Sequence, residues 1–118
     1  QGYELIHLKT INSLNDAVKN YSLDFIYMPA NNAFNSDLQK SQNFGAKLYM
    51  LIGDIDIDLM FEKSNVYLDK FGGDFSFNLL SELEIHGEYA FDKNSSSYLL
   101  GLKYAGNYDF TITSEWYK

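Results

Sequence analysis

Residues 46–61 read AKLYMLIGDIDIDLMF, and this stretch decides the fold. Apolar residues recur at every second position on both sides of Gly53-Asp54, which is the alternation of a β-strand. Glycine at the first central position of a two-residue turn favours a type II′ hairpin, because glycine tolerates positive φ. The sequence therefore predicts a hairpin over residues 45–61 with one apolar face. The predicted pairs on that face are Ile52–Ile55, Met50–Ile57, Leu48–Leu59 and Ala46–Phe61.

The same period of two continues through two more hairpins, over residues 70–91 and 98–116. We expect their loops at 78–82 and 105–109. The predicted pairs are Phe77–Leu83, Phe75–Ile85, Gly73–Gly87 and Phe71–Tyr89 in the second hairpin, and Tyr104–Phe110, Leu102–Ile112, Leu100–Ser114 and Tyr98–Trp116 in the third. The turn centres are spaced 27 residues apart. This spacing leaves room for strands of about 9–11 residues, long enough to cross a bilayer when tilted.

The first part of the chain is less regular. Alternation predicts strands over residues 3–9 and 21–27, and Ser13 begins a possible helix of one or two turns that ends at Asn20. A polar, asparagine-rich loop is expected over 29–42. We therefore interpret 1–118 as a single β-barrel domain or a fragment of one, with less regular strands and a long loop over 1–42 and three regular hairpins over 43–118.

The composition excludes several classes of protein. Sixteen acidic residues face nine lysines, and a net charge of −7 argues against a nucleic-acid partner because phosphate would be repelled. The absence of cysteine excludes disulfides and thiolate-bound metal, and we expect no metal site and no cofactor. No apolar run is long enough for a membrane-spanning helix. The chain begins with glutamine and has no leader, which suggests a processed chain or an excerpt.

The two faces of the predicted sheet differ sharply. None of the 24 positions on the apolar face of the three hairpins is charged. Such a sheet can be a transmembrane β-barrel, with lipid outside and a wet lumen inside. It can also be a soluble antiparallel barrel or sandwich that binds an apolar ligand in its interior. Long strands, alternating short and long connections, and aromatic residues near strand ends favour the membrane barrel. The residues predicted for a lipid-facing aromatic girdle are Tyr89, Tyr98, Tyr104 and Trp116.

Three segments carry a family resemblance. The stretches GGDFSFNLLSELEIHGEYAFD (residues 72–92), YLLGLKYAGNYDFTITSEWY (98–117) and LDFIYMPANN (23–32) resemble hairpins of porin-like outer-membrane β-barrel proteins of Gram-negative bacteria. The resemblance implies an all-β, antiparallel up-and-down meander in the bacterial outer membrane. It also implies passive transport or a structural surface role, with membrane lipid and small solutes or cations as partners. The lysine at the C-terminus and the missing leader suggest an internal fragment of a longer barrel.

The charged face offers candidate chemistry. Asp54, Asp56 and Asp58 are predicted to form a row of carboxylates that binds a cation, or a simply solvated face partly neutralised by Lys47. Glu84, His86 and Glu88, with Asp74 predicted opposite His86, form either an acid–base cluster or a hydrogen-bonded network. Because no nucleophile with an orienting partner is evident, we expect no enzyme. A catalytic outer-membrane barrel would need a nucleophile from strands outside this sequence. The predicted lumen-lining residues, which together favour cations, are Lys47, Asp54, Asp56, Asp58, Asp74, Glu84, His86, Glu88, Lys103 and Glu115.

Overall fold

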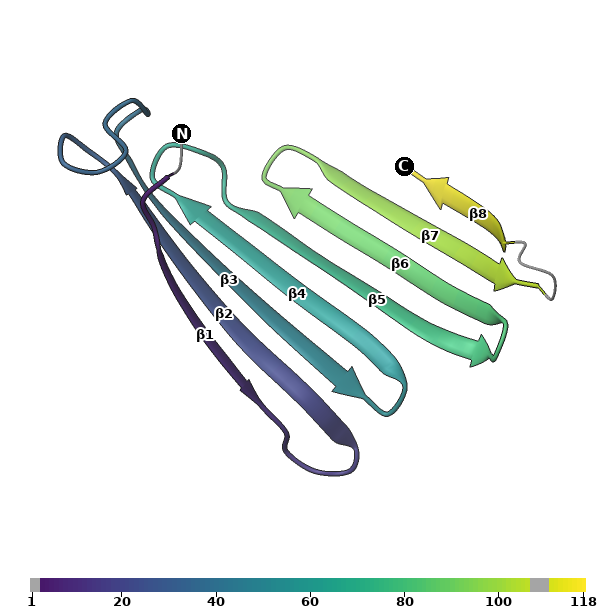
Figure 1. Ribbon diagram of the computed structural model, residues 1–118. Helices are drawn as coiled ribbons and strands as arrows, with labels where there is room; N and C mark the ends of the chain where they lie inside the picture. Colours follow the sequence, from purple (N-terminus) through teal and green to yellow (C-terminus); the bar gives the residue numbers. More distant parts are fainter. Residues whose placement is uncertain (1–2, 107–110) are drawn as a thin grey trace.

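The described part of the chain folds into a single antiparallel sheet of eight strands in sequential order (Figure 1). The computed structural model describes residues 3–106 and 111–118. It contains no helix in that part of the chain, and the all-β meander predicted from the sequence is confirmed. The strands are β1 (Ile6–Asn12), β2 (Val18–Ala30), β3 (Ser41–Ile52), β4 (Ile55–Ser64), β5 (Lys70–Leu80), β6 (Leu83–Asp92), β7 (Ser96–Ala105) and β8 (Thr111–Tyr117).

The first predicted hairpin is confirmed residue by residue. Ile52 lies opposite Ile55, and the pairing continues without a bulge from there to Asn43 opposite Ser64. Gly53 adopts a φ of 62°, while Asp54 keeps a negative φ. Positive φ at the first central residue alone is the geometry of a type II′ turn. The turn residue therefore fixes the register of β3 and β4.

The predicted register of the second hairpin is wrong by two residues. Phe77 lies opposite Ile85 and not Leu83, because the connection is the two-residue turn Ser81-Glu82 and a bulge near Leu79 absorbs the odd residue. The predicted Gly73–Gly87 pair is replaced by Gly73 opposite Tyr89 and Phe75 opposite Gly87. Each glycine thus gains an aromatic neighbour, which compensates for its missing side chain.

The third hairpin is also displaced by two residues. Tyr104 lies opposite Ile112, and Leu100 lies opposite Trp116. The cause is that β7 continues to Ala105, whose N–H donates to the carbonyl of Glu82 in the neighbouring turn at 2.8 Å. The predicted partner of Tyr104, Phe110, lies outside the described residues. The rings of Tyr98 and Trp116 still touch diagonally, with centroids 5.1 Å apart.

The first part of the chain belongs to the same sheet. The predicted helix at residues 13–20 is wrong, because the side chain of Asn15 accepts from the N–H groups of Ala17 and Val18 and closes a turn. Strand β2 follows directly and pairs with β1 from Tyr27 opposite Ile6 onward. The loop 31–40 is tied down by Asn35, at a φ of 49°, whose side chain bonds the backbone of Glu4 and Pro29.

The sheet is a single layer with almost no core. Ala30 is the one buried apolar residue in the described part of the chain, and no large side chain there is fully buried. Strand β1 is paired only with β2, and β8 only with β7, so the ladder is open at both edges (Figure 1). Because both register errors are two residues, the paired side chains of β5 to β8 keep their predicted faces. Each face must therefore be covered by something other than the described chain, or be solvated.

Candidate functional site

The polar face gathers nearly all of the predicted lumen residues. The ladders place these residues on one side of the sheet: Lys47, Asp56, Asp58, Asp74, Glu84, His86, Glu88, Lys103 and Glu115. Asp54 is not among them, and the predicted three-carboxylate row is wrong in this respect. Asp54 lies in the β3–β4 turn, and its side chain is 88% exposed. It forms an ion pair with Lys19 at 2.9 Å. The turn takes Asp54 out of the alternation that carries Asp56 and Asp58.

An acidic row crosses the middle of this face. Asp58, Asp74 and Glu88 lie directly opposite one another on β4, β5 and β6. Like charges in directly opposite positions repel, since facing side chains of neighbouring strands are close together. Lys47 offsets part of this charge through an ion pair with Asp58 at 2.9 Å. Asp74 and Glu88 have no hydrogen bond or ion pair with another described residue, so the row keeps an excess of negative charge.

His86 lies at the centre of a second polar cluster. Its Nε2 is 3.5 Å from Glu115 Oε1, and its Nδ1 is 3.9 Å from Glu84 Oε1. Lys103 Nζ is 3.7 Å from the other oxygen of Glu84. The predicted Asp74–His86 pair does not form: Asp74 faces Glu88, and Ser76 is the residue opposite His86. The cluster therefore joins β6, β7 and β8.

Two further polar groups were not predicted. On β1 and β2, Asp24 accepts from His7 Nε2 at 2.7 Å and lies 3.6 Å from Lys9 Nζ. On β3 and β4, the Tyr49 hydroxyl donates to Asp56 Oδ1 at 2.5 Å. The first group was missed because the sequence does not set the register of β1. The second joins diagonal neighbours, whereas the alternation of residues along a strand indicates only which residues lie directly opposite.

The apolar face carries a band of aromatic rings toward the end of the sheet where loop 31–40 lies. Phe61, Phe71 and Phe91 are directly opposite one another on β4, β5 and β6. The predicted girdle residues Tyr89 and Tyr98 pair with each other two residues nearer the opposite end. Trp116 continues the band on β8, with its ring against Tyr98. Tyr104, the fourth predicted girdle residue, lies instead at the other end of the sheet, opposite Ile112.

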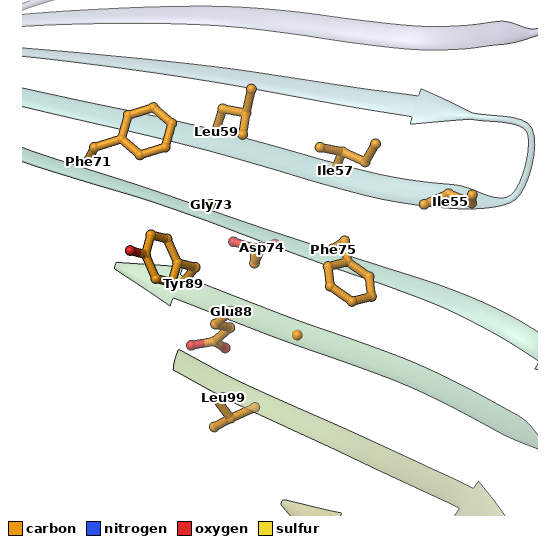
Figure 2. A pocket seen from close by; sticks show the side chains of 11 residues that line it. Ile55, Ile57, Leu59, Phe71, Gly73, Asp74, Phe75, Glu88, Tyr89 and Leu99 are labelled. Atoms are coloured by element: carbon orange, nitrogen blue, oxygen red, sulfur yellow. The ribbon is translucent and has the colours of Figure 1, made fainter. Parts of the chain in front are cut away.

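A shallow depression interrupts the apolar face where Gly73 and Gly87 provide no side chain (Figure 2). Its volume is about 470 Å³. Figure 2 shows Ile55, Ile57 and Leu59 along one side, with aromatic rings beside the strand that carries Gly73. Its apolar wall is built by Ile55, Ile57, Leu59, Phe71, Phe75 and Tyr89.

Neither a metal centre nor a relative identifies the chain. Among the described residues, no group of three or more histidine or carboxylate side chains is arranged to hold a metal ion. The same part of the chain contains no helix long and apolar enough to cross a membrane. No protein-family model, curated protein or solved structure matches the sequence. The features of the chain that bear on its function are the two faces of the sheet.

Proposed function

We propose that the chain forms part of a porin-like outer-membrane β-barrel, with lipid on its apolar face and water on its polar face. The observation that carries the proposal is a single-layer sheet whose uncharged face of aliphatic and aromatic residues has no other described element packed against it. A transmembrane barrel has this division, because strands alternate between the lipid and the lumen. Passive transport of small solutes, or a structural role at the cell surface, follows from such an architecture.

The shielding of several charged side chains supports this orientation. The side chains of Asp24, Asp58 and His86 on the polar face are 14%, 17% and 20% exposed. Leu100 and Tyr89 on the apolar face are 49% and 47% exposed as whole residues. In a soluble protein the shielded side of a curved sheet is the apolar one. Here Asp24, Asp58 and His86 are shielded on the polar face, whereas Lys47, Lys103 and Glu115 are about half exposed there. Shielded charged groups suit a polar lumen.

The position of the aromatic band also supports a tilted barrel. Strands tilted by roughly 40° and spaced about 4.8 Å apart are displaced by roughly 4 Å, about one residue, from one strand to the next. A band at constant depth in the membrane must shift by the same amount. Successive strand pairs align Phe61 on β4 with Ser96 on β7, whereas Trp116 on β8 lies opposite Leu100. Ser96 and Leu100 are four residues apart, so the band shifts by four residues over the four strand pairs from β4 to β8.

The height of the apolar face fits a bilayer. Leu83 and Phe91 mark its ends on β6, eight residues apart. At about 3.3 Å per residue this is roughly 26 Å along the strand, or roughly 20 Å along the membrane normal at a 40° tilt. The apolar band of outer-membrane barrels is about 25 Å tall.

The charge of the polar face favours cations in the proposed lumen. The row of Asp58, Asp74 and Glu88 has Lys47 as its one ion-paired cation among the described residues. Fixed negative charge on a pore wall attracts cations and repels anions. We therefore expect potassium to pass more readily than chloride.

The depression at Gly73 and Gly87 favours a second candidate, a soluble β-domain that holds an apolar ligand. Its volume of about 470 Å³ lies within the range of small-molecule sites. In that case the apolar face would be covered by protein and ligand, and not by lipid. The two candidates differ in whether lipid reaches the apolar face.

Labelling of adjacent positions tests the proposal. The chain has no cysteine, so Leu102→Cys on the apolar face and Lys103→Cys on the polar face give matched single-thiol variants. In lipid vesicles we expect a charged, water-soluble maleimide to label Lys103→Cys but not Leu102→Cys, and to label both after unfolding. Equal labelling of both variants in vesicles would refute insertion. Protection of Leu102→Cys in lipid-free buffer would establish the soluble alternative.

Trp116 provides an independent measurement. It is the one tryptophan of the chain and is 62% exposed on the apolar face. Brominated acyl chains should quench its fluorescence in vesicles, because quenching requires contact with the lipid tails. Unchanged fluorescence in brominated lipid would contradict the proposal.

A further inference from the structure

The His86 imidazole bridges three strands. It projects from β6, lies over Gly101 on β7 and reaches Glu115 on β8, with 3.5 Å between Nε2 and Oε1. In the described part of the chain β8 is an edge strand, held by the ladder to β7 alone. The side chain of His86 therefore adds a contact between the edge strand and a strand that is not its neighbour.

Gly101 is what makes this reach possible. A Cβ at position 101 would overlap with the imidazole Nε2, so any other residue there must displace the ring. The clash involves only the far end of the histidine side chain and not the backbone. A Gly101→Ala chain can thus keep its strands while the imidazole rotates away from Glu115.

The surroundings of His86 are predominantly acidic. Glu84 on its own strand lies 3.9 Å from Nδ1, and Glu115 lies beyond Nε2. Lys103 on β7 shares Glu84, at 3.7 Å. Of the other charged groups on this face, Glu88 is on β6 and Asp74 is on β5. His86 Nδ1 is shielded from solvent and has no hydrogen-bond partner among the described residues. A positive ring would be attracted by two carboxylates and opposed by one ammonium group.

We propose that His86 is a pH-sensitive link that fastens the edge strand β8 to β6 across Gly101. Histidine is the side chain that gains its proton between pH 8 and pH 5. A protonated ring forms charge-assisted contacts with carboxylates, and these are stronger than contacts of the neutral ring. The link is therefore expected to be stronger at pH 5.5 than at pH 8. It depends on the sheet alone, and holds whether lipid or protein covers the apolar face.

Amide hydrogen exchange of β8 tests the link, in whichever medium, buffer or detergent micelles, the chain gives a β-sheet spectrum. After correction for the intrinsic pH dependence of exchange, we expect protection of the β8 amides to be about fivefold greater at pH 5.5 than at pH 8. The ratio should fall to one in His86→Gln and in Glu115→Gln. A ratio below twofold in the parent chain would overturn the proposal.

Two further variants separate the link from other effects of pH. Gly101→Ala keeps the histidine but displaces its ring, so the pH dependence of β8 should disappear. His7→Gln removes the other histidine of the chain, which lies on β1, and should leave the ratio unchanged. Persistence of the pH effect in Gly101→Ala, or its loss in His7→Gln, would show that contact between His86 and Glu115 is not its cause.

Discussion

The contact of Phe75 with Gly87 leads to a prediction that tests the register of the second hairpin. A Cβ at position 87 would lie 2.6 Å from Phe75 Cε1 and 2.9 Å from Cζ. Both distances are well below ordinary carbon–carbon contact, so Gly87→Ala must displace the ring. Had the pairing predicted from the sequence been right, Phe75 would face Ile85, and Gly87→Ala would not meet this ring.

The magnitude follows from two opposing effects. Overpacking of this kind costs about 1–3 kcal/mol. Replacing glycine by alanine within a strand gains about 0.5–1 kcal/mol, because glycine loses more conformational freedom on folding. We expect Gly87→Ala alone to lower the free energy of unfolding by about 1 kcal/mol. In a Phe75→Ala background, where the next atom is the carbonyl oxygen of Leu99 at 3.4 Å, the same change should be neutral or stabilising.

A double-mutant cycle measures the difference. Urea unfolding of the parent chain, both single variants and the double variant, followed by Trp116 fluorescence, gives the coupling free energy. We expect about 1.5–2 kcal/mol, or roughly tenfold to thirtyfold in the unfolding constant. A control cycle pairs Gly87→Ala with Phe44→Ala, which lies on β3 opposite Tyr27, and should be additive. Coupling below about 0.5 kcal/mol between positions 75 and 87 would refute the register.

Three other predictions concern single residues. Asp74→Asn should lower the potassium-to-chloride permeability ratio in planar bilayers, whereas Asp54→Asn, whose exposed carboxylate lies in a turn, should leave it unchanged; a preference for chloride in the parent would contradict the acidic lumen. Asn35→Ala removes three hydrogen bonds to the backbone of Glu4 and Pro29 and should destabilise by about 1–3 kcal/mol, seen as faster proteolysis of loop 31–40; unchanged cleavage would count against this role. Gly53→Ala forces a side chain into positive φ and should cost about 1 kcal/mol in urea unfolding, and an unchanged midpoint would disprove the turn type.

Turn chemistry explains which registers could be predicted from the sequence. Gly53 allowed one turn type, and a two-residue turn leaves one register, so the first hairpin was predicted correctly. Residues 78–82 contain no glycine or proline to mark the turn, and a bulge at Leu79 is invisible in the alternation. The end of β7 depended on a hydrogen bond from Ala105 to Glu82, which joins two different hairpins.

The polar face could be predicted more reliably than the contacts on it. An error of two residues returns each side chain to its own face, so the acidic character of that surface survived both register errors. The predicted contacts between side chains were less accurate, because a contact depends on which residue lies directly or diagonally opposite on the next strand. Glu84 was correctly predicted beside His86, but Asp74 was placed opposite it, whereas the further acidic neighbour is Glu115 on β8. Predicting the role of Gly101 would have required the correct registers of β6, β7 and β8 together.

The energetics of the apolar face decide what the sheet requires. Eighteen of its large apolar or aromatic side chains are more than one-third exposed. Full burial of such a side chain stabilises a fold by about 1.5–3 kcal/mol. Partial exposure therefore loses on the order of 1 kcal/mol of stabilisation for each side chain, or roughly 20 kcal/mol in total. This exceeds the net stability of an ordinary domain, about 5–15 kcal/mol. Water on both faces is therefore not a stable arrangement, and the sheet needs an apolar cover. Hydrocarbon provides one without a complementary protein surface, and it leaves the acidic face to water.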